Sequence, residues 1–86
     1  MSALQERVLF EQLKEAFIII QKSKQINKEM ASWERRVAEM NEDEIEQSCM
    51  RVTRNISLFV ENEKRKGRTL NDKQISNKVK EELNNL

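Results

Sequence analysis

Apolar residues recur along the chain at the spacing of α-helices, and three helices account for the pattern. The predicted helices span residues about 3–39, 42–66 and 72–84. No run of strand length alternates aromatic or β-branched residues with polar ones, so a sheet is not expected. The predicted fold class is all-α, with residues 1–86 forming a single helical domain. In it, a long N-terminal helix has two shorter helices folded back along it.

The helix boundaries rest on a capping signal that occurs more than once. An N-cap residue is followed three residues later by Glu or Gln, so that each side chain accepts a hydrogen bond from the other residue's backbone N–H. The instances are Asn41 with Glu44, Asn71 with Gln74 and, more weakly, Ser2 with Gln5. The end of the second helix carries the cations of residues 64–66 followed by Gly67, which is typical of a helix C-terminus.

Each of the two shorter helices has one apolar face. Residues placed at intervals of 100° gather on one side of the helix and indicate the side that is buried. The face of the second helix consists of Ile45, Cys49, Val52, Ile56, Phe59 and Val60, and that of the third consists of Ile75, Val79, Leu83 and Leu86.

The first helix differs because it carries two apolar stripes. The first runs its whole length through Leu4, Val8, Ile19, Ile26, Met30, Trp33, Val37 and Met40. The second occupies the N-terminal half, about 120 to 140° away, and consists of Leu9, Phe10, Leu13, Ala16, Phe17 and Ile20. Two helices with one face each do not easily cover both stripes.

The surplus stripe is the main functional indication in the sequence. A chain of 86 residues buries a thin core, and such chains are often stabilised by association. We therefore expect self-association, as a helical dimer with coiled-coil packing, and a protein partner as the commonest use of such a surface. The predicted partner interface is Leu9, Phe10, Leu13, Phe17 and Ile20. The alternative is that the third helix covers this stripe within the monomer.

Several kinds of chemistry lack the residues they need. The chain has no histidine and one glycine, which excludes Ser-His and Cys-His nucleophile pairs and glycine-rich phosphate loops. We expect no catalytic residue, cofactor or metal site, and therefore no enzyme. The single cysteine, Cys49, falls on the apolar face of the second helix, where a buried structural role is favoured over a redox sensor.

Charge is unevenly distributed although the net charge is only +1. Residues 42–63 carry two basic and six acidic side chains, whereas residues 64–80 carry seven basic and one acidic. The basic residues are Lys64, Arg65, Lys66, Arg68, Lys73, Lys78 and Lys80. They favour, as an alternative function, a nucleic-acid-binding accessory protein that contacts phosphates.

The remaining signals concern location and class of protein. The longest apolar run is the five residues of 16–20, far below the roughly 20 that cross a bilayer, so no membrane span is expected. The N-terminus lacks the features of a secretory signal, which together with one thiol favours the cytoplasm. In size and in lysine, asparagine and isoleucine usage the chain resembles small accessory proteins of bacteriophages and plasmids. The predicted function is a non-enzymatic protein-interaction module, as a homodimeric adaptor, regulator or inhibitor.

Overall fold

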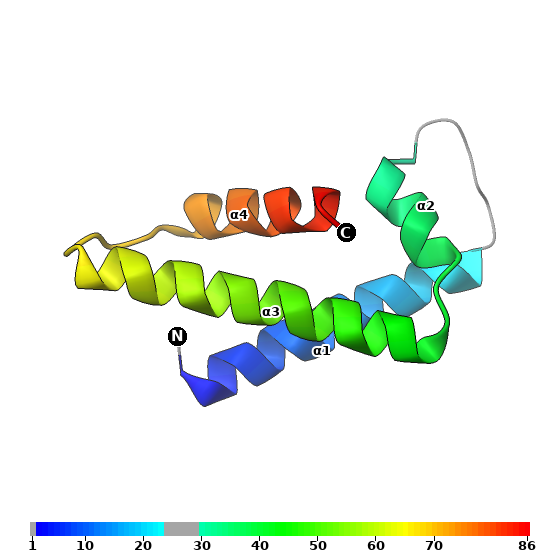
Figure 1. Cartoon of the computed structure of the whole chain (residues 1–86), viewed down its shortest axis with the longest axis horizontal. Coiled ribbons are helices and arrows are strands. Elements are labelled where there is room, and N and C mark those ends of the chain that lie inside the picture. The colour runs from blue at the N-terminus through cyan, green and yellow to red at the C-terminus, as the bar shows by residue number, and fades with distance from the viewer. Residues whose placement is uncertain (1, 24–29) are drawn as a thin grey trace.

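The longest of the described helices forms the axis of the molecule (Figure 1). Two of the other helices pack directly against it, and the shortest packs mainly against those two. The computed structural model describes residues 2–23 and 30–86. Within them lie four helices rather than the predicted three: α1 (Ala3–Ser23), α2 (Ser32–Ala38), α3 (Glu42–Arg65) and α4 (Asp72–Asn84). Figure 1 shows α4 running along one side of α3 and α1 crossing the other side. The all-α prediction is confirmed, and the predicted bounds of the last two helices agree with α3 and α4 to within a residue.

The capping signals form the hydrogen bonds that the sequence predicts. At the start of α3, Glu44 N donates to Asn41 Oδ1 over 2.8 Å and Asn41 N donates to Glu44 Oε1 over 3.3 Å. At the start of α4, Gln74 N donates to Asn71 Oδ1 over 2.9 Å and Asn71 N donates to Gln74 Oε1 over 3.0 Å. Ser2 and Gln5 exchange the same pair of bonds before α1. Each of these helix starts therefore has two otherwise unpaired backbone donors satisfied.

The prediction of one continuous helix over residues 3–39 is wrong. The chain forms α1 and the short α2 instead, and α2 folds back onto the end of α1. A helix of roughly 37 residues would be about 55 Å long, whereas the longest dimension of the molecule is 43 Å. In the packed position of α2, Val37 is completely buried, and the centroids of the Trp33 and Phe17 rings lie 6.2 Å apart. Folding back thus removes from water apolar side chains that a straight helix would carry beyond the end of the core.

A side chain of α1 fixes the position of α2. Gln21 Nε2 donates to the backbone oxygens of Val37, over 3.2 Å, and Met40, over 2.6 Å. The Val37 oxygen lies in the last turn of α2, where it also accepts from Met40 N, and the Met40 oxygen lies two residues beyond the helix. Gln21, near the end of α1, thus ties the C-terminal end of α2 to α1.

The core confirms the predicted faces of α3 and α4 except at Phe59, which is half-buried and lies outside the core cluster. The buried apolar residues are Leu13 and Phe17 of α1, Val37 of α2, Ile45, Cys49, Val52 and Ile56 of α3, and Leu83 of α4. Half-buried side chains, among them Val60, Ile75, Val79 and Leu86, pack against this cluster. At the edge of the α3–α4 contact, Asn55 Nδ2 donates to Glu82 Oε2 over 2.9 Å.

The two stripes of α1 have the opposite roles to those predicted. The stripe assigned to a partner faces the core: Leu13 and Phe17 are buried, and Leu9, Phe10 and Ile20 pack against the core cluster. The stripe expected to face the core is exposed on α1, with Leu4, Val8 and Ile19 exposed by 71%, 47% and 60%. Ile26 lies outside the described residues.

The separation of α1 and α2 into two helices explains the exchange. A continuous helix would have had to face the core with the stripe that includes Trp33 and Val37. Because those two residues reach the core from α2, the rotation of α1 is independent of them. α1 therefore turns its denser, aromatic stripe inward, which removes more apolar area from water. The premise that this stripe is left over for a partner is wrong.

We predict that Phe17→Ala lowers the free energy of unfolding by about 3 to 5 kcal/mol, because the change removes a buried aromatic ring and leaves a cavity. Leu4→Ala, in the outward stripe of α1, is the control, and it should change stability by less than about 0.5 kcal/mol because Leu4 is 71% exposed. Denaturant melts followed by circular dichroism measure both. Equal losses in the two variants would contradict the assignment of the stripes.

Candidate functional site

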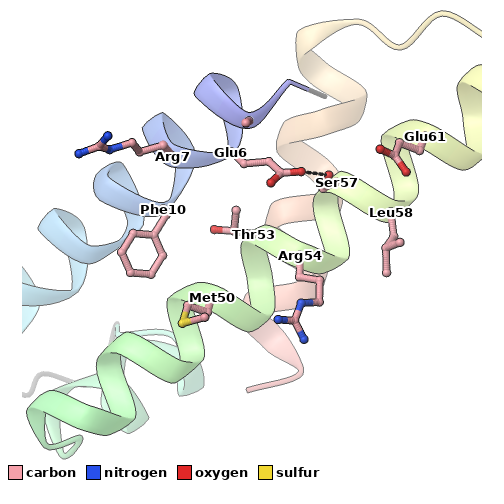
Figure 2. A pocket seen from close by; sticks show the side chains of 10 residues that line it. Glu6, Arg7, Phe10, Met50, Thr53, Arg54, Ser57, Leu58 and Glu61 are labelled. Atoms are coloured by element: carbon pink, nitrogen blue, oxygen red, sulfur yellow. Dashed lines mark hydrogen bonds between the residues drawn. The ribbon is translucent and has the colours of Figure 1, made fainter.

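A groove of about 520 Å³ lies between the first two turns of α1 and the middle of α3 (Figure 2). Its lining residues are Ala3, Glu6, Arg7 and Phe10 of α1 and Met50, Thr53, Arg54, Ser57, Leu58 and Glu61 of α3. Both walls are helical, so the backbone of each is internally hydrogen-bonded and side chains carry the chemistry of the groove.

Two polar residues of α3 form the floor of the groove. Thr53 and Ser57 are one turn apart, on the flank of the α3 apolar face that meets α1, and each is 7% exposed. Ser57 donates its hydroxyl to the Glu6 carboxylate. Thr53 Oγ1 has no hydrogen-bond partner in the part of the chain that the structure describes. Figure 2 shows this hydroxyl pointing toward Phe10 of α1. A threonine in a helix commonly donates to the carbonyl one turn earlier, but Thr53 does not form this bond. The groove therefore contains a buried hydroxyl with unused bonding capacity.

The walls of the groove combine exposed apolar side chains with charges. Met50 and Leu58 are 48% and 53% exposed, which is high for large apolar residues. Arg7 is paired with Glu11 at 3.5 Å. Within residues 2–23 and 30–86, Arg54 and Glu61 form no ion pair. The groove thus offers apolar contact together with one positive and one negative group whose charges are not already engaged.

Sequence reasoning missed this site. Met50 and Leu58 lie off the predicted α3 face, although two apolar residues outside an otherwise clean face are a detectable signal. Nothing in the sequence pattern predicts that α1 packs against the Thr53 side of α3. Of the predicted interface residues, only Phe10 lines the groove.

The outer face of α1 carries a second, shallower depression of about 340 Å³. Its lining residues are Glu11, Lys14, Glu15, Ile18, Ile19 and Lys22. Ile19 is the apolar residue most exposed there, and acidic and basic groups surround it. This surface faces away from the α1 residues that enter the core.

The basic residues of the segment 64–80 are only partly available to a ligand. Lys66 and Arg68 lie 4.0 Å and 3.3 Å from the Glu63 carboxylate. Lys78 is half-buried, pairs with Glu81 and Glu82, and lies 5.2 Å from the centre of the Phe59 ring. The remaining four are exposed and, among the described residues, make no ion pair: Lys64, Arg65, Lys73 and Lys80. Lys64 and Arg65 end α3 and Lys73 begins α4, so these three gather at one end of the molecule.

The environment of Cys49 is that of a structural cysteine. The side chain is fully buried in the core between α1 and α3. Burial raises the pKa of the thiol to about 11, and the positive charge of Lys14 opposes this rise only in part. The reactive form of cysteine is the thiolate, so the raised pKa and the burial both suppress oxidation and alkylation.

We predict that Cys49 reacts slowly with a thiol reagent in native buffer at pH 8 and rapidly in denaturant. The free energy of unfolding should also fall as the pH rises from about 9 toward 11, because the thiol ionises first in the unfolded chain. The pH profile of Cys49→Ala should lack this loss, although the variant is less stable throughout. Rapid labelling of the native protein would contradict the burial.

Neither a metal site nor a known relative adds to this description. Among the described residues, no three acidic, cysteine or histidine side chains are grouped so as to hold a metal ion. None of the described helices is long and apolar enough to cross a membrane. No family model, curated protein or solved structure matches this chain.

Proposed function

We propose that this chain is a non-enzymatic protein-interaction module that acts as a homodimeric adaptor, regulator or inhibitor. The observation that carries the proposal is the pair of unpartnered apolar surfaces, the groove between α1 and α3 and the outer face of α1. Large apolar residues exposed together and surrounded by charges are typical of sites that bind protein.

The shape of the groove favours a helical ligand. A groove between two helices can hold an amphipathic helix. The apolar residues of that helix fill the groove, and its charged residues reach the rim. Met50 and Leu58 supply the apolar wall, and Arg54 and Glu61 supply groups that fix register and orientation.

We predict that the protein self-associates at micromolar concentration, with a mass near twice 10.3 kDa. Gel filtration coupled to light scattering, over a hundredfold range of concentration, measures the mass directly. Leu58→Glu should shift the equilibrium to the monomer without loss of helix content, because Leu58 is exposed and contributes little to the core. A wild-type mass of 10.3 kDa at every concentration would contradict self-association.

Nucleic-acid binding is the second candidate, and the cluster of Lys64, Arg65 and Lys73 at one end of the molecule favours it. These cations have no acidic partner among the described residues, so they are available to phosphates. The candidate stands second because three of the seven basic side chains are engaged with carboxylates of the same chain.

We predict for this second function that the affinity for duplex DNA falls with salt with a log-log slope of about −3 to −4, as about four phosphate contacts require. Replacing Lys64, Arg65 and Lys73 by Gln should flatten the slope by about two to three units. Replacing Arg7, Lys14 and Arg35 removes the same charge elsewhere and should leave the slope unchanged. Undetectable binding at low salt would remove this function.

A further inference from the structure

Two surfaces of this chain carry the same spacing of residues with opposite charges. On α3, Arg54, Leu58 and Glu61 follow one another at steps of four and three residues; on α1, Glu15, Ile19 and Lys22 do the same. This spacing places each trio on one face of its helix. Read in the same direction, one face is positive, apolar, negative and the other is negative, apolar, positive.

Both faces are accessible in the monomer. Ile19 is 60% exposed and Leu58 is 53% exposed, and the four charged residues are exposed as well. In the part of the chain that the structure describes, none of these four charges takes part in an ion pair. Each face also adjoins a concavity, since Leu58 borders the groove between α1 and α3 and Ile19 borders the depression on α1.

We propose that the occupant of the groove is α1 of a second copy of this chain, with Glu15 on Arg54, Ile19 on Leu58 and Lys22 on Glu61. This inference rests on the proposed self-association and names its interface. α1 of each copy runs parallel to α3 of the other. Ile19 enters the groove of the second copy, and Leu58 of that copy enters the depression beside Ile19.

The directions of the helices are those that a closed dimer requires. Within one chain α1 and α3 are antiparallel: Glu6 meets Ser57, whereas Lys14, further along α1, lies near Cys49, earlier in α3. If α1 is parallel to α3 of the other copy, the two α1 helices are antiparallel to each other. A two-fold axis perpendicular to the helices produces this arrangement, and both copies of the contact form at once.

The Arg54 charge fits the same arrangement. Arg54 is exposed and lines the groove. Its guanidinium would donate to Glu15 of the second copy, and such charge-assisted hydrogen bonds are stronger than neutral ones. Thr53, one residue earlier, points to the α1 side of the groove and takes no part in this contact (Figure 2). An uncharged ligand helix would leave Arg54 without its counter-ion.

Exchange of charges between the two faces tests the interface. One variant carries Glu15→Lys with Lys22→Glu, and the other carries Arg54→Glu with Glu61→Lys, so both retain the wild-type net charge. Each variant alone should dimerise at least about tenfold more weakly, because four attractive contacts per dimer become repulsive. An equimolar mixture should recover a dimer that contains one copy of each, since every contact is again between opposite charges. Light scattering gives the mass, and circular dichroism checks that helix content is unchanged.

A disulfide gives a second, independent measurement. The variant with both Ile19→Cys and Leu58→Cys should form a covalent dimer under mild oxidation, whereas Ile19→Cys alone and Leu58→Cys alone should not. A wild-type dimer that both charge-exchanged variants match, or a mixture that recovers nothing, would overturn this interface and leave self-association standing. A monomeric wild type would overturn both and would leave the groove to a different protein.

Discussion

The packing of the whole molecule depends on the single apolar face of α3. Ile45, Cys49, Val52 and Ile56 are almost completely buried, and no residue of α3 itself covers them. α1 covers one flank of this face and α4 covers the other, and the hydrogen-bonded pair Asn55 and Glu82 closes the α4 side. Because the core is thin, each covering helix contributes only a few buried side chains, and the loss of either would expose a large part of the face.

The position of α1 decides which surfaces remain for other molecules. Because Trp33 reaches Phe17 from the separate helix α2, the rotation of α1 is not tied to that of α2, and α1 buries its aromatic stripe. This orientation exposes Leu4, Val8 and Ile19, and it sets the N-terminal turns of α1 beside Thr53 and Ser57. The groove and the outer depression are thus consequences of the same packing of α1 on α3.

The surfaces of the molecule differ in whether their charged side chains already form ion pairs within the chain. At the end of α3, Glu63 forms ion pairs with Lys66 and Arg68. In α4, Lys78 forms ion pairs with Glu81 and Glu82. The groove contains Arg54 and Glu61 with no such partner in the described residues, next to apolar side chains that water solvates poorly. Charge pairing across an interface contributes to register and partner choice more than to bulk affinity, so the groove is better suited than the basic end to specific recognition of a protein.

The sequence by itself determined where α3 and α4 begin and which of their sides is buried. The pairs Asn41 with Glu44 and Asn71 with Gln74 specify helix starts because a capping box acts over three residues and needs no tertiary contact. The faces of α3 and α4 were predictable for the same reason, since each helix has one apolar side. Only the tertiary structure decided that α1 and α2 are separate helices, and how α1 is rotated. A helix with two apolar stripes has two acceptable orientations, and the choice between them depends on which side chains, brought from elsewhere in the chain, fill the space on α3.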